Sequence, residues 1–184
     1  MASDFFMSEK TLLMSASALE RALTRIAHEI AERNDDDPSG ICVVGIQRGG
    51  VALADRLGAL LSEILGRKVE VGYLDVAMFR DDLGSRPAPE IAPTMIPFDC
   101  AGRTVALVDD VLYSGRTVRA AMDAVHAYGR PRRIQLATLI DRGHRELPIK
   151  PDFVGKNVPT AQNERVDVRL VERGGNDEVY LERL

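Results

Sequence analysis

The sequence predicts an α/β fold in which a central, mostly parallel sheet is flanked by helices. Two observations predict it: short apolar runs alternate with amphipathic stretches, and the runs lack a polar face. Continuous apolar strands are typical of parallel sheets covered on both faces. Strands that alternate with helices favour βαβ units. The length fits one domain, residues 1–184.

Three helices are expected. The first, over residues 18–33, repeats apolar residues every three or four positions from Leu19 to Ile30, which is helical spacing. Ser17, followed three residues later by Glu20, is typical of a capping box at its start. The other two helices are expected over residues 51–65 and 117–128.

The apolar runs predict strands, and two segments lack any period. Residues 78–97 carry four prolines and are too long for a simple connector, so we expect a flexible loop over about 77–97. Residues 141–159 are expected to be irregular. Strands are expected over residues 41–46, 69–76, 104–108, 133–140, 166–171 and 178–181, with a short strand or a loose start at 11–14.

Composition narrows the class of protein. The net charge of −4 does not indicate a nucleic-acid binder, so RNA binding would need a local basic patch. Cys42 and Cys100 lack a disulfide or zinc pattern, which indicates free thiols in a reducing compartment. No signal peptide or membrane span is evident. We therefore expect a cytoplasmic protein.

The clearest chemical signal follows the strand over 104–108. Asp109 and Asp110 come first, and Ser-Gly-Arg-Thr at 114–117 opens the next helix. Parallel sheets bind ligands beyond their carboxyl ends, and a helix start offers unpaired N–H groups to a phosphate. The two carboxylates suit the vicinal hydroxyls of a ribose, or water on a divalent cation. The plain alternative is a helix cap and a solvated turn.

A second loop has a similar setting. Residues 47–50 (Gln-Arg-Gly-Gly) lie between a predicted buried strand and a predicted helix. Glycines and a cation at that position suit a second anion, although a simple strand-to-helix turn has the same pattern.

The motif over 105–117 resembles the type I phosphoribosyltransferase family. The resemblance implies that family's fold, with a small hood and a flexible loop. It also implies a 5′-phosphate of phosphoribosyl pyrophosphate (PRPP) in the loop, ribose hydroxyls on Asp109 and Asp110, and pyrophosphate at 47–50. Tyr113 replaces an acid found in purine-using members, which speaks against a purine base. The expected PRPP or nucleotide contacts are Arg48, Gly49, Asp109, Asp110, Val111, Leu112, Tyr113, Ser114, Gly115, Arg116 and Thr117.

Four further segments narrow the resemblance. Residues 21–30, 79–83, 141–149 and 154–160 resemble, in this order, the PyrR family of bacterial pyrimidine-operon attenuators and uracil phosphoribosyltransferases. The likeness runs from about residue 12 to 181. It implies conversion of uracil and PRPP to UMP and pyrophosphate, with Mg²⁺ held through PRPP and no firm protein ligand. It also implies UMP or UTP as effectors, and a homodimer or tetramer.

The resemblance assigns further roles. Catalysis is expected to use Arg80, Asp109 and Asp110, with Arg80 on the loop holding pyrophosphate; its alternative is a surface salt bridge to Asp81 or Asp82. Arg142 and Val166 are expected to frame uracil. One departure stands out: the family usually has Thr-Arg-Gly where this chain has Arg-Gly-Gly at 48–50, so the arginine is displaced by one residue.

The first predicted helix has a polar, partly basic side opposite its apolar side. Such a side is ordinarily just solvated, and His28 could instead cap the helix or pair with Glu32. The resemblance implies binding of the pyr operon mRNA leader. The residues expected to bind RNA are Thr24, Arg25, His28, Arg33, His144, Arg145, Lys150 and Lys156.

Two other functions fit the same residues. The displaced arginine favours an RNA-binding regulator with little catalysis, and the acidic balance favours a stand-alone phosphoribosyltransferase without RNA function.

Overall fold

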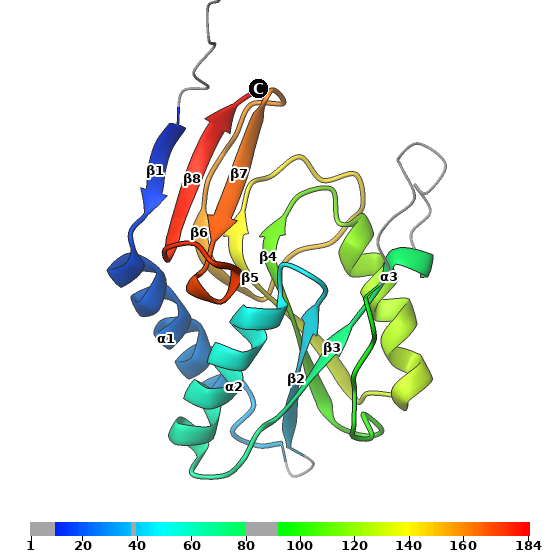
Figure 1. The fold of residues 1–184 in the computed structure, drawn as a ribbon. Helices are drawn as coiled ribbons and strands as arrows, with labels where there is room; N and C mark the ends of the chain where they lie inside the picture. The colour runs from blue at the N-terminus through cyan, green and yellow to red at the C-terminus, as the bar shows by residue number, and fades with distance from the viewer. Residues whose placement is uncertain (1–9, 38–39, 80–91) are drawn as a thin grey trace, which may run out of the picture.

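The predicted α/β fold is confirmed by a computed structural model that describes residues 10–37, 40–79 and 92–184. Its centre is a five-stranded, wholly parallel sheet in the order β3-β2-β4-β5-β6 (Figure 1). The strands are β2 (Ile41–Ile46), β3 (Glu70–Leu74), β4 (Thr104–Leu112), β5 (Arg133–Asp141) and β6 (Phe153–Asn157).

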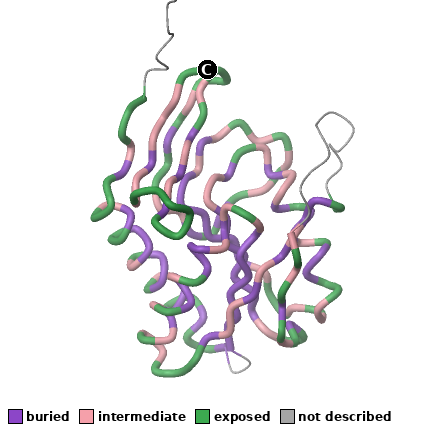
Figure 2. Tube along the Cα trace, in the orientation of Figure 1, coloured by how far each residue is buried: buried purple, intermediate pink, exposed green. Residues whose placement is uncertain are grey.

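Helices cover both faces of this sheet (Figure 1). One core contains the apolar sides of α1 (Ala16–Arg33) and α2 (Val51–Leu65). The other core lies under α3 (Arg116–Val125), which continues as the 3-10 turn η3 (His126–Tyr128). Every residue of β2 is buried, as its apolar run predicts for a strand packed on both faces. Buried residues concentrate along these strands and on the inner sides of the helices (Figure 2).

A second, antiparallel sheet of order β1-β8-β7 stands beside the carboxyl ends of β4 and β5 (Figure 1). We call this three-stranded sheet the hood. Val166 of β7 is buried in the same core as α1 and α2, so the hood is packed onto the main domain. Its elements are β1 (Lys10–Met14), β7 (Glu164–Arg169) and β8 (Glu178–Arg183), with the 3-10 turn η4 (Val171–Arg173) between β7 and β8.

Three local expectations were wrong. Ser15, not Ser17, caps α1 and accepts a hydrogen bond from the backbone N–H of Ala18. β4 continues through Leu112 instead of ending at 108, because its last residues pair with β5. The segment 141–159 was expected to be irregular but contains β6, which pairs with β5 at the sheet edge; its short sequence has no strong apolar run of its own.

Both cysteines are buried free thiols, as the sequence predicts. A hydrogen bond with Cys100, followed by burial, raises the pKa of the Cys42 thiol. None of the described helices is long and apolar enough to cross a bilayer.

Arg56 on α2 clamps the main domain to the turn before β8. Its guanidinium donates to both carboxylate oxygens of Glu172 and of Asp177 at 2.6–2.9 Å. The hydrogen bonds from Arg56 lower the pKa of each carboxyl group. A carboxyl group whose pKa is lower in the folded than in the unfolded protein stabilises the fold at pH values above its unfolded pKa, near 4. This stabilisation is lost as the pH falls through the lowered pKa of the folded state.

We therefore expect Arg56→Gln to lower the free energy of unfolding by about 1–2 kcal/mol at pH 7, the partial exposure of the cluster limiting the loss. Below pH 4 the difference from the unaltered protein should shrink. Urea unfolding at pH 7 and pH 3.5 measures both values. A difference that is equal at the two pH values would contradict the linkage.

Candidate active site

The candidate site lies where the carboxyl ends of β2 and β4 meet the loops that follow them. β4 carries Asp109 and Asp110 inside the strand, where Asp109 pairs with Thr138 of β5. Asp109 is 8% exposed, and its carboxylate accepts the N–H of Asp110 at 2.9 Å. The Asp110 carboxylate accepts the N–H of Val111 at 2.7 Å and is only half-buried. The second acid is thus the one more open to a ligand.

The loop after β2 packs directly against that second acid. A Cβ atom added to Gly49 would lie 2.3–2.4 Å from the carboxyl atoms of Asp110. At Gly50 an added Cβ would lie 2.0 Å from the Val108 carbonyl oxygen. Gly50 therefore requires glycine, because any side chain would overlap backbone atoms of β4 and β2, whereas a side chain at position 49 would force the Asp110 carboxylate or the loop to move. The loop after β2 thus packs against the last residues of β4, and the peptide bond between Gln47 and Arg48 is cis.

The phosphate loop, residues 113–117, joins β4 to α3. Gly115 is the N-cap residue of α3 and has a φ of 92°, a left-handed conformation that favours glycine. The Ser114 hydroxyl accepts the N–H of Arg116 at 3.4 Å. The first N–H groups of a helix have no partner within the helix and carry its positive dipole end. This end of α3 therefore suits a phosphate, as the sequence predicts.

Residues 143–149, which we call the site loop, wrap the outer side of the phosphate loop. The backbone N–H groups of Glu146 and Leu147 both donate to the Ser114 carbonyl, at 3.0 and 3.2 Å. The Glu146 carboxylate also accepts from Nε of Arg116 at 2.6 Å. The side chain of Arg116 thus faces the site loop, and the backbone of the phosphate loop is attached to it.

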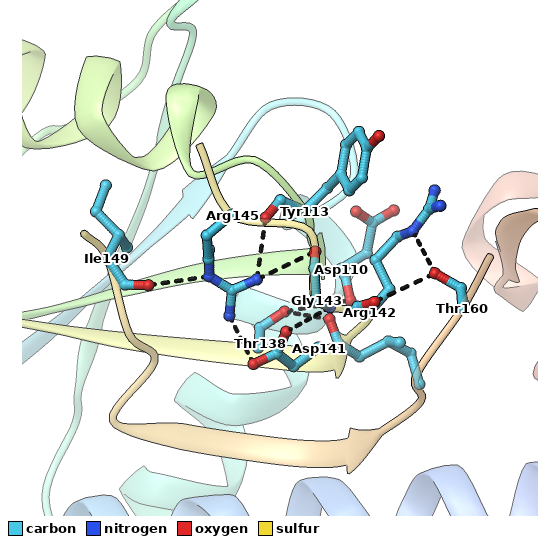
Figure 3. A network of polar contacts seen from close by, with 10 residues as sticks. Asp110, Tyr113, Thr138, Asp141, Arg142, Gly143, Arg145, Ile149 and Thr160 are labelled. Carbon is cyan, nitrogen blue, oxygen red and sulfur yellow. Dashed lines mark hydrogen bonds and ion pairs between the residues drawn. The ribbon is translucent and has the colours of Figure 1, made fainter. Parts of the chain in front are cut away.

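Arg145 occupies the centre of this contact (Figure 3). Its guanidinium donates to the carbonyls of Tyr113 at 3.0 Å and Ile149 at 2.9 Å. It also forms an ion pair with Asp141, at the end of β5, at 2.6 Å. Its side chain is 22% exposed. The arginine expected to bind RNA is therefore engaged with the phosphate loop, the site loop and the end of β5.

Arg142 and Tyr113 form a stacked pair beside the phosphate loop. The Arg142 guanidinium lies 4.2 Å from the centre of the Tyr113 ring. It also donates to the Thr160 hydroxyl at 3.0 Å (Figure 3). A further hydrogen bond goes to the Glu164 carbonyl at 2.8 Å. Tyr113 itself is 39% exposed. Of the two residues predicted to frame uracil, Arg142 lies beside the phosphate loop, whereas Val166 is buried in the core.

Both ends of the long loop are fastened near β3. The Asp75 carboxylate accepts the N–H groups of Ala77 and Ala92, and the Gln47 side chain donates to the Pro93 carbonyl. Met95 pairs with Tyr73 of β3. Asp75 therefore holds the two stems of this loop together. Arg80, predicted to be catalytic, lies outside the described residues.

The residues expected to bind RNA fall into two places. Around β6, Arg25 donates to the carbonyls of Val154 and Gly155, Arg33 pairs with Asp152, and Lys156 donates to the Leu13 carbonyl. Here Thr24 is half-buried and His28 is exposed. The other place is residues 144–150: His144 contacts the Thr160 carbonyl, Arg145 is engaged as above, and Lys150 is exposed.

Sequence patterns did not indicate Asp75 or Asp141 as site residues. Each contacts a partner that is distant in the chain or lies on a loop. Periodicity and spacing in the sequence therefore do not predict these contacts. Only the resemblance over 141–149 marked the neighbourhood of Asp141.

The phosphoribosyl transferase domain model matches residues 14–173, and the parallel sheet with its phosphate loop fits that match, so the fold and site define a phosphoribosyltransferase. Curated relatives named "Bifunctional protein PyrR" are 59% identical in Roseiflexus sp. (strain RS-1), covering 96% of this chain and 97% of the relative, and 55% identical in Chloroflexus aurantiacus, with the same coverage. The chain belongs to the PyrR family.

Solved structures agree on the fold. A hypoxanthine phosphoribosyltransferase of Trypanosoma cruzi matches with a TM-score of 0.71 at 17% identity, covering 94% of this chain and 96% of that one. A hypoxanthine-guanine phosphoribosyltransferase of Bacillus anthracis matches with a TM-score of 0.67 at 19% identity, covering 94% and 97%. At these identities the likeness shows the fold alone.

Proposed function

We propose that this phosphoribosyltransferase joins uracil to PRPP, releasing UMP and pyrophosphate, and that it also regulates pyrimidine genes by uridine-nucleotide-dependent RNA binding. The observation that carries the enzymatic half is the position of Asp109 and Asp110 at the end of β4, where Gly49 packs against Asp110 and the chain leads into the start of α3. The printed name of the relatives, a bifunctional protein, supports two activities in one chain.

The chemistry follows from the charges. The bond from the ribose C1′ to pyrophosphate breaks, the bond from C1′ to the uracil N1 forms, and the N1 proton is lost. Positive charge develops on the ribose as the pyrophosphate leaves. Asp109 and Asp110 would hold the ribose hydroxyls and lie near this charge, while the N-terminus of α3 would hold the 5′-phosphate.

Mg²⁺ would enter with PRPP. The described residues contain no cluster of three or more His, Cys, Asp or Glu side chains that could hold a metal, whereas the half-buried Asp110 suits a water on a PRPP-bound ion. When bound, the ion supplies charge neutralisation on the pyrophosphate. The backbone of residues 47–50 would position that leaving group, and Arg80 on the long loop remains our candidate for a second cation.

Base preference is tested by pyrophosphate release from PRPP with uracil, hypoxanthine or orotate. We expect turnover with uracil only, because Tyr113, stacked on Arg142, offers a neutral ring where an acid would meet a purine. Turnover with hypoxanthine would overturn the base assignment. No turnover with any base would instead favour an RNA-binding regulator with little catalysis.

The RNA half is tested with the double variant Arg25→Ala, His28→Ala. We expect its affinity for a pyrimidine-operon leader RNA to fall at least tenfold, because a charged donor and an exposed imidazole are removed from α1. Filter binding with and without UMP measures it. Since Arg25 also ties α1 to β6, unchanged uracil turnover is the control for folding. Unchanged RNA affinity would contradict this surface and leave a stand-alone enzyme.

We also propose that the protein forms a homodimer or a homotetramer. We expect it to act in the cytoplasm, where PRPP and the mRNA are both present.

A further inference from the structure

We infer that Arg145 is a positioning residue for PRPP: it acts on the reaction by holding the phosphate loop in its binding conformation. The inference deepens the proposed function, because it concerns the same site. It starts from the contacts of the guanidinium, which joins three separate parts of the chain: the Tyr113 carbonyl of the phosphate loop, the Ile149 carbonyl of the site loop, and the Asp141 carboxylate of β5.

The direction of these contacts matters for a phosphate. In a planar trans peptide the carbonyl and the following N–H point in opposite directions. Arg145 holds the Tyr113 carbonyl toward the site loop, and two N–H groups of the site loop hold the Ser114 carbonyl the same way. The N–H groups of Ser114 and Gly115 are therefore turned away from the site loop. Consecutive N–H groups that point to one side form an anion-binding concavity.

Without the arginine the Tyr113 carbonyl would lose its side-chain donor, and only the Ser114 carbonyl would stay bound to the site loop. Asp141 lies at the end of β5, where it is paired with Leu112 of β4, so it gives Arg145 a rigid anchor in the central sheet. Arg145 thus joins the phosphate loop both to the sheet and to the site loop. With most of its donors satisfied within the protein, it is poorly placed to bind RNA as its main role.

The test compares Arg145→Gln and Arg145→Lys with the unaltered protein. Calorimetric binding of PRPP without any base is the first readout, because it does not depend on uracil being the substrate. We expect Arg145→Gln to weaken PRPP binding and to raise the KM for PRPP about tenfold, with a smaller change in the KM for uracil. Arg145→Lys should recover part of the affinity, because its single ammonium can pair with Asp141 but cannot also reach both carbonyls.

Two further variants sharpen the result. Arg173→Gln removes an exposed guanidinium from the turn before β8 and should change nothing. Asp141→Asn should weaken PRPP binding in the same direction as Arg145→Gln, and the two changes combined should cost less than their sum, because they act through one interaction.

The inference is overturned if Arg145→Gln binds PRPP as tightly as the unaltered protein, in particular if leader RNA binding is lost at the same time, which would make Arg145 an RNA contact. If Arg145→Gln does not fold, Arg145→Lys decides: an unchanged melting temperature together with unchanged PRPP affinity would equally overturn it. If the unaltered protein does not turn over uracil, only the assignment of uracil as the substrate base is wrong. The inference about Arg145 is still tested, because PRPP binding is measured separately.

Discussion

Gly49→Ala is expected to lower kcat/KM for PRPP about 100-fold, equivalent to about 2.7 kcal/mol of transition-state stabilisation. The added methyl group would lie 2.3–2.4 Å from the carboxyl carbon and both oxygens of Asp110, far inside contact distance. Either Asp110 or the loop after β2 must move. Both outcomes separate the acid proposed for the ribose from the loop proposed for pyrophosphate, and displacements near 1 Å can cost this much in rate.

Steady-state kinetics with PRPP as the varied substrate measures the effect. Gly66→Ala is the matched control: nothing lies within 4 Å of its added Cβ, but its φ of 63° is left-handed. That substitution should lower the free energy of unfolding by about 1 kcal/mol and leave kcat/KM unchanged. If Gly49→Ala retains kcat/KM within twofold, Asp110 and the loop after β2 do not act together on PRPP.

Asp110→Asn is expected to lower kcat/KM for PRPP about 100-fold as well, with little loss of stability. The half-buried carboxylate keeps its size and its acceptor for the Val111 N–H, so the strand is retained. What is removed is the negative charge that would bind the ribose hydroxyls and stabilise the positive charge developing on the ribose. Asp109→Asn should also reduce stability, because its carboxylate is buried and accepts the N–H of Asp110.

Asp123→Asn provides the control, since it removes an exposed acid from α3 without touching the site. Steady-state kinetics and urea unfolding of the three variants distinguish the effect of the lost carboxylate charge on catalysis from its effect on the stability of the fold. A loss of stability in Asp110→Asn that matches its loss of activity would mean that the carboxylate holds the strand and not the substrate.

Much of the fold follows from local pattern. The apolar runs that became β2 and β4 and the periodicity that became α1 and α2 can be predicted because each depends on neighbours a few residues away. β6 escaped prediction because its pairing with β5, not its own sequence, makes it a strand. The cap of α1 was misplaced by two residues for a related reason: Ser15 and Ser17 both lie at the start of the helix, and only the backbone conformation selects Ser15.

The candidate site divides in the same way. By itself the sequence determined the two acids and the Ser-Gly-Arg-Thr turn over 109–117, because a strand, a loop and a helix start lie within a few residues of each other. Tertiary structure alone decided that Gly49 packs on Asp110 and that Arg145 holds the phosphate loop. These contacts join segments 61 and 32 residues apart, counting from Gly49 to Asp110 and from Tyr113 to Arg145. No periodicity in one segment encodes where another segment will lie, because packing of the whole sheet brings them together.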